Sequence, residues 1–81
     1  MGTKIEFIFN NKKESLERIP SECLSRFKER INFIKLLESN NFIWKDAHKL
    51  SKIWYNIIYY KMKYNSSTYN QIIKFNKLLK C

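Results

Sequence analysis

The sequence predicts an α+β domain in which an N-terminal strand precedes two helices that pack on a small antiparallel sheet. Three observations support this class. Apolar residues alternate with polar ones over residues 3–10, they recur at helical spacing over residues 21–39, and β-branched and aromatic residues dominate residues 53–64. The chain has 81 residues, 44% of them hydrophobic, which suits a single domain over residues 1–81 with a thin core.

The first strand is predicted over residues 3–10, because apolar side chains occupy every second position there. A short helix is expected next, over residues 11–19. Asn11 and Glu14 have the spacing of a capping box, and Pro20 ends the segment because it lacks a backbone N–H donor.

The clearest element is an amphipathic helix over residues 21–39. Its apolar residues recur at spacings of three and four and are expected in the core: Leu24, Phe27, Ile31, Ile34 and Leu37. The opposite, exposed face is assigned to Arg26, Glu29 and Arg30. Asn40 and Asn41 are expected to end the helix, since asparagine tolerates a left-handed cap.

Two interpretations remain open for residues 42–81. The abundance of β-branched and aromatic residues favours a hairpin with its turn at residues 65–68, which would complete the antiparallel sheet. The alternative makes this half helical, because apolar residues also follow a helical stripe from Ala47 through Trp54 to Ile58.

Charge is concentrated in the second half of the chain. The formal net charge is +9, and residues 41–81 hold eight lysines against Asp46 alone. Such a field attracts polyanions, since lysine near a phosphate backbone releases condensed counterions. RNA or DNA is therefore the expected partner, and generic phosphate contacts are predicted for Lys45, Lys49, Lys52, Lys74 and Lys77.

Other functional classes find little support in the sequence. Cys23 and Cys81 are far apart and His48 is the only histidine, so neither a disulfide framework nor a metal site is expected, and no cofactor is predicted. Cys23 is expected to be a small buried side chain. No apolar run approaches the roughly 18 residues of a membrane span, and no targeting signal is evident, so a cytoplasmic location without membrane association is expected.

Several short motifs resemble the RelE/ParE superfamily of small bacterial toxins. The stretch from Lys13 to Ile31 resembles that family's paired helices with their Leu-x-x-Leu-Pro connector. The step at His48-Lys49-Leu50 is similar to the one that precedes the family's central sheet. The segment from Tyr60 to Lys63, followed by a turn and Tyr69, resembles its hairpin.

This resemblance implies a toxin that binds RNA or the ribosome, possesses a cognate antitoxin, and either cleaves mRNA or is an inactive relative. Cleavage by a 2′-hydroxyl needs proton transfer and stabilisation of a charged phosphate. The resemblance assigns those roles to Lys61 and Lys63, which would share one face of a strand. Asn65 and Asn70 stand where the family usually has arginine, and asparagine cannot supply arginine's charged contacts to a phosphate.

Two further hypotheses complete the set. The helical alternative resembles a Cro-like helix-turn-helix DNA-binding protein with its turn at Ser51, although Asp46 and Lys52 fall where apolar residues are expected. The other is a small basic subunit of a nucleoprotein assembly. In that case the tyrosines interleaved with lysine around Lys61 either stack bases or provide packing area.

Overall fold

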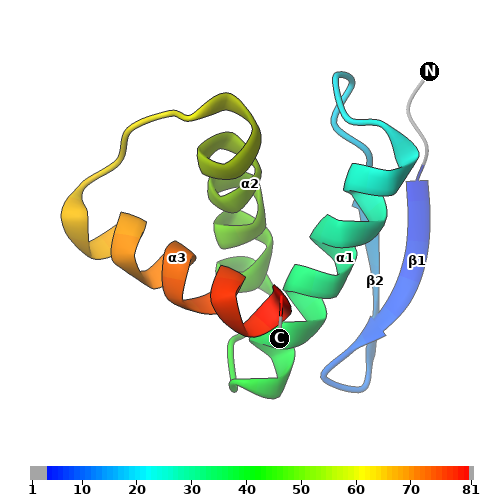
Figure 1. Ribbon diagram of the computed structural model, residues 1–81. Helices are drawn as coiled ribbons and strands as arrows, with labels where there is room; N and C mark the ends of the chain where they lie inside the picture. The colour runs from blue at the N-terminus through cyan, green and yellow to red at the C-terminus, as the bar shows by residue number, and fades with distance from the viewer. Residues whose placement is uncertain (1–3, 81) are drawn as a thin grey trace.

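The chain forms a β-hairpin followed by three helices (Figure 1). A computed structural model describes residues 4–80, so the predicted strand start at Thr3 and the position of Cys81 lie outside the described residues. In chain order the elements are β1 (Lys4–Phe9), β2 (Lys12–Glu17), α1 (Leu24–Ser39), α2 (Trp44–Tyr60) and α3 (Ser66–Lys80).

The hairpin confirms the first predicted strand and corrects the segment after it. β1 and β2 are antiparallel, with Ile5 opposite Leu16. The two residues between them, Asn10 and Asn11, have φ angles of 51° and 64°. Two consecutive positive φ angles are what a tight type I′ hairpin turn requires, and asparagine tolerates them. The helix predicted over residues 11–19 is therefore wrong: the asparagines form a hairpin turn instead of a helix cap.

The long amphipathic helix is confirmed as α1, with Phe27, Phe33, Ile34 and Leu37 buried. The burial of three residues in or next to this helix differs from the expectation. Leu24 and Cys23 are exposed, whereas both were expected to be buried. The main reason is position, since both lie at the start of the helix, beyond the part that faces the core. Arg30, which was assigned to the exposed face, is fully buried.

Within residues 42–80 the structure has two helices and no strand, so the hairpin predicted there is wrong. α2 and α3 cover almost all of this half, and a connector of residues 61–65 joins them. The helix-turn-helix geometry is also wrong in detail, because α2 runs unbroken through Ser51. The Ser51 hydroxyl is buried and donates to the carbonyl of His48 at 2.7 Å, which satisfies it within the helix.

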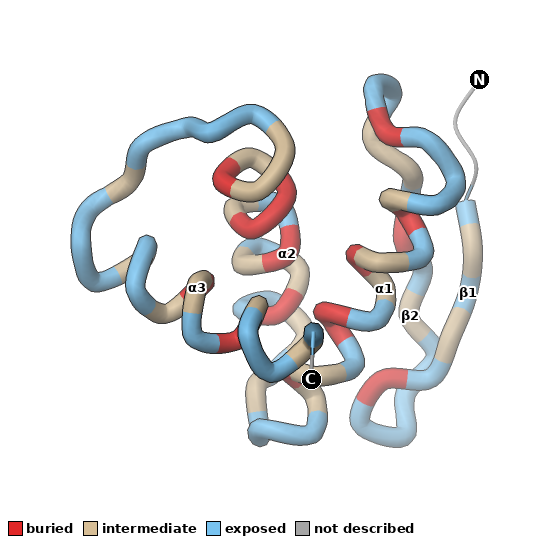
Figure 2. Tube along the Cα trace, viewed as in Figure 1, coloured by how far each residue is buried: buried red, intermediate tan, exposed pale blue. Residues whose placement is uncertain are grey.

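One core joins all five elements. Trp54 stacks on Phe33 with ring centroids 5.1 Å apart, and Phe9 contacts Trp44 edge to face at 5.4 Å. Figure 2 shows buried segments where α1 and α2 face each other, with the hairpin turn and the connector exposed. The predicted α+β class is confirmed, with the sheet limited to the two N-terminal strands and three helices packed together.

Candidate nucleic-acid interface

Three of the predicted phosphate contacts lie on one exposed side of α2. Lys45, Lys49 and Lys52 are separated by four and three residues, which places them within about 60° of arc around the helix axis and over about 10 Å of its length. All three are exposed, whereas Ala47 and Trp54 on the other side of the helix are buried. We call these three residues the lysine face.

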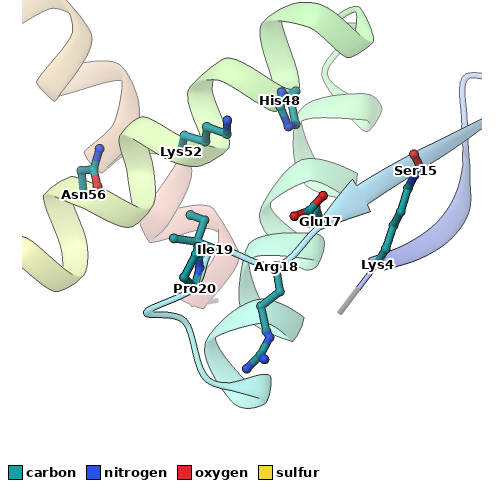
Figure 3. A pocket seen from close by; sticks show the side chains of 9 residues that line it. All are labelled: Lys4, Ser15, Glu17, Arg18, Ile19, Pro20, His48, Lys52 and Asn56. Carbon is teal, nitrogen blue, oxygen red and sulfur yellow. The ribbon is translucent and has the colours of Figure 1, made fainter. Parts of the chain in front are cut away.

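The lysine face borders a cavity of about 630 Å³ between α2 and the N-terminal hairpin (Figure 3). α2 contributes one residue from each of three successive turns, namely His48, Lys52 and Asn56. The rest of the lining comes from the hairpin and the segment after it: Lys4, Ser15, Glu17, Arg18, Ile19 and Pro20. We call this the basic cavity.

Cations outnumber anions in the basic cavity. The lining holds three cations, Lys4, Arg18 and Lys52, and one carboxylate, that of Glu17. Arg18 also donates to the carbonyl of Glu22 at 2.9 Å. Two neutral hydrogen-bonding side chains, Ser15 and Asn56, complete the polar lining. Charge and donors together suit an anionic ligand with several acceptor oxygens, such as a phosphate group.

The surroundings of His48 disfavour its charged form at the edge of this cavity. Burial lowers the pKa of His48 below its usual value of 6.5, and the charges of Lys52 and Arg30 lower it further. Its ring also lies against Trp44, with centroids 5.3 Å apart. The positive field that depresses the His48 pKa is the same field that would attract a phosphate.

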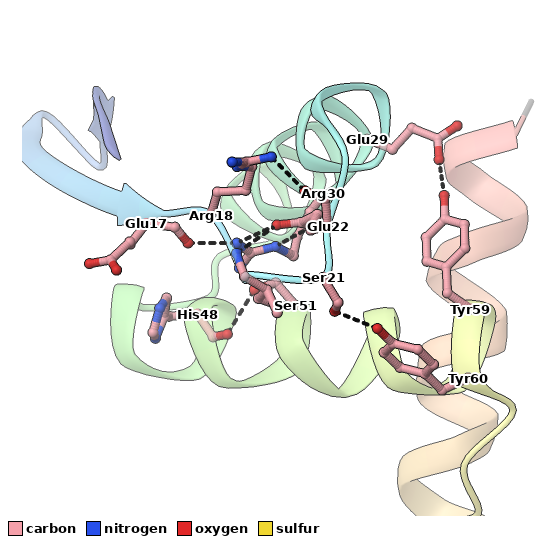
Figure 4. Close-up of polar contacts among 11 residues, drawn as sticks. Glu17, Arg18, Ser21, Glu22, Glu29, Arg30, His48, Ser51, Tyr59 and Tyr60 are labelled. Atoms are coloured by element: carbon pink, nitrogen blue, oxygen red, sulfur yellow. Dashed lines mark hydrogen bonds and ion pairs between the residues drawn. The ribbon is translucent and has the colours of Figure 1, made fainter. Parts of the chain in front are cut away.

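A buried ion pair fixes one wall of the basic cavity (Figure 4). The Nε of Arg30 donates to the Glu22 carboxylate at 2.8 Å, and Nη2 of Arg30 donates to the carbonyl of Glu17 at 2.9 Å. Glu22 also accepts from the N–H of Ile19 at 3.1 Å. These bonds tie the end of β2 and the segment after it to α1. This role of Arg30 is not predicted by the sequence, because nothing in the helical pattern distinguishes Arg30 from an exposed arginine.

Lys61 and Lys63 lie in the connector and not on a strand. Lys61 has a left-handed backbone with φ 56°, and the next N–H, that of Met62, donates to the carbonyl of Asn56 at 3.1 Å. Both lysines line a second cavity of about 360 Å³, together with Ile57, Met62, Tyr64 and Tyr69. None of these six residues is a carboxylate or a histidine, so the catalytic role of the two lysines stays a prediction.

The remaining predicted residues have separate positions. Lys74 and Lys77 are exposed on α3 and line neither of these two cavities. Asn65 caps α3, because its side-chain oxygen accepts from the N–H of Thr68 at 2.8 Å. Asn70 is exposed on the same helix. Of the five predicted phosphate contacts, Lys52 lines the basic cavity, Lys49 lines a separate cavity together with Asp46, and Lys74 and Lys77 lie on α3.

Tyr59 is already engaged with the core. Its hydroxyl donates to Glu29, and the Arg26 guanidinium lies 4.2 Å from its ring centroid. Burial, followed by this carboxylate, raises the pKa of Tyr59 to about 12. Among the tyrosines near Lys61, this one is a packing residue.

Within residues 4–80, no three or more His, Cys, Asp or Glu side chains gather in a way that would hold a metal ion. In the same part of the chain, no helix has the length and apolar character needed to cross a membrane.

Comparisons with known proteins give no relative from which a role can be transferred. No protein-family model, curated protein or solved structure matches the chain. The fold and site thus define the protein by its own features: a small basic α+β domain with a hairpin, three helices and a cationic cavity between hairpin and α2.

Proposed function

We propose that this protein binds nucleic acid through the phosphate backbone, using the lysine face and the basic cavity as one surface. The observation that carries the proposal is the position of Lys52, which belongs to the lysine face and also lines the basic cavity. A backbone lying along the exposed side of α2 would therefore meet a continuous row of cations that leads into the cavity.

The charge of the whole molecule supports this proposal. The formal net charge of +9 favours encounter with a polyanion, and each lysine that approaches a phosphate releases condensed counterions. Contacts of this kind position a nucleic acid without reading its bases. The expected activity is therefore binding with weak sequence preference and strong salt dependence.

Backbone binding is common to the toxin, DNA-binding and assembly-subunit hypotheses. The RelE/ParE relationship, mRNA cleavage and a cognate antitoxin stay hypotheses, and they no longer have the predicted hairpin to support them. The helical second half favours the binding function, because α2 alone presents the lysine face.

The proposal is tested by fluorescence anisotropy with labelled single-stranded RNA, single-stranded DNA and duplex DNA over a range of salt concentrations. The double variant K49A/K52A removes two exposed cations of the interface. The slope of log K against log salt should become shallower by about 1.4 for single strands and about 1.8 for duplex, from 0.7 or 0.9 per lost phosphate contact.

The matched control is K28A/K35A, which removes two exposed lysines from α1 and gives the same net charge. It should change the slope much less than K49A/K52A does. Absence of binding, or equal losses in the two double variants, would refute the proposed interface. Cleavage of the RNA probe that is abolished in K61A/K63A would instead support the toxin hypothesis.

A further inference from the structure

We infer that the cavity at the α2–α3 connector receives an unstacked base of a single-stranded nucleic acid whose backbone lies on the lysine face. This inference rests on the proposed function and adds the class of nucleic acid. We call the site the aromatic cavity; it is lined by Ile57, Lys61, Met62, Lys63, Tyr64 and Tyr69.

The aromatic cavity combines apolar surface with cations. Met62 and Tyr69 are 49% and 44% exposed and line the same cavity, so their apolar surface is accessible to a ligand. Tyr64 is half-buried beside them, and both lysines are exposed. Aromatic rings that stack bases, next to lysines that hold the backbone, are the combination found in proteins that bind single strands.

One hydrogen bond links a residue that lines the aromatic cavity to a residue that lines the basic cavity. The side-chain amide of Asn56 donates to the hydroxyl of Tyr64 at 3.2 Å. Asn56 lines the basic cavity, and Tyr64 lines the aromatic cavity. Lys52 lies eight residues, or about 12 Å of helix, before the end of α2, so one strand can follow this side of the helix from one cavity to the next.

The backbone around the aromatic cavity is held in place before any ligand binds. The left-handed Lys61 and the bond from the Met62 N–H to the Asn56 carbonyl close the end of α2. On the other side, Asn65 caps the start of α3, and Tyr69 lies in the first turn of that helix. A site fixed in this way loses little conformational entropy when a base enters it.

Charge favours a nucleic acid over an apolar protein segment as the occupant. Two lysines border the apolar lining, and no carboxylate is among the six lining residues. The bases of a duplex are stacked and paired, so entry of a base requires single-stranded nucleic acid or costs unstacking energy. The aromatic cavity therefore predicts a preference for single strands over duplex.

The experiment compares Tyr69→Ala and Tyr69→Phe for binding to a single-stranded RNA and to the RNA duplex of the same sequence. Tyr69→Ala should weaken binding of the single strand by about fivefold or more, as loss of one base–aromatic stack does, and leave duplex binding within about twofold. Tyr69→Phe keeps the ring and should bind normally. Circular dichroism confirms that both variants keep their helices.

A second probe separates the contribution of the bases to binding from the contribution of the sugar-phosphate backbone. An oligomer of abasic sugar-phosphates should bind the normal protein more weakly than RNA, and Tyr69→Ala should not weaken its binding further. Equal effects of Tyr69→Ala on single strand and duplex, or none on either, would overturn the inference even if K49A/K52A still weakens both. If the unaltered protein binds no probe, the proposed function fails, and the inference fails with it.

Discussion

Arg30 is a buried side chain that supports one wall of the basic cavity from the interior of the protein. Its guanidinium is fully buried and ion-paired with Glu22, whose side chain is equally buried. The pair also bonds to the backbone of Glu17 and Ile19, both of which line the basic cavity. Hydrogen bonds from Nε and Nη2 offset part of the cost of burying two charges, whereas Nη1 of Arg30 is buried with no hydrogen-bond partner among the described residues.

Arg30→Ala should lower the free energy of unfolding by about 3–5 kcal/mol, because it leaves the Glu22 carboxylate buried without its partner. The double variant R30M/E22L removes both charges and should be more stable than Arg30→Ala. Urea unfolding followed by circular dichroism measures these differences. Lys28→Ala, an exposed change on the same helix, should stay within about 0.5 kcal/mol of the unaltered protein. A loss below about 1 kcal/mol in Arg30→Ala would contradict the structural role.

His48 should link nucleic-acid binding to pH. Its folded-state pKa is lowered by burial, Lys52 and Arg30, so protonation below pH 6.5 reduces the stability of the free protein. A phosphate in the basic cavity would counter those charges and raise the His48 pKa. Binding should then take up a proton, and affinity should increase as pH falls from about 7 to about 5.

The measurement is Kd against pH for the unaltered protein and for His48→Gln, which cannot titrate. Proton NMR follows the ring directly, since His48 is the only histidine in the chain. The pH dependence should flatten in the variant. If affinity changes equally with pH in the unaltered protein and in His48→Gln, the phosphate does not bind next to His48 in the basic cavity.

At the scale of elements, two asparagines decide that the N-terminal region is a hairpin. The φ angles of Asn10 and Asn11 are both positive, and the side chain of Asn10 donates to the carbonyl of Phe42 at 3.2 Å. The second strand that results supplies Ser15 and Glu17 to the basic cavity. The turn therefore positions the hairpin side of the site.

Asn11→Val should destabilise the protein by about 1–2 kcal/mol, since a β-branched residue is strained at φ 64°. Asn11→Gly should be neutral or slightly stabilising, because glycine adopts this conformation without a Cβ clash. Thermal unfolding of the two variants gives the comparison. Equal melting temperatures for Val and Gly at this position would show that the turn conformation does not limit stability.

At the scale of the whole molecule, the two halves of the chain have different roles. Residues 41–80 hold eight lysines and one aspartate and contain α2, the connector and α3. The hairpin and α1 carry the buried ion pair and the other wall of the basic cavity. The basic cavity therefore combines cations from both halves: Lys4 and Arg18 from the first half and Lys52 from α2.

The sequence alone determined the α+β class, the first strand, the long helix and the positive second half, because alternation, helical spacing and net charge are local properties. Only the tertiary structure decided between strand and helix in residues 42–81. β-branched and aromatic side chains fit any half-buried surface, and here they lie on a helix, α2, whose Trp54 stacks on Phe33 of α1. The basic cavity needed the fold as well. Lys4 and Lys52 are far apart along the chain and share a cavity only because the hairpin packs beside α2.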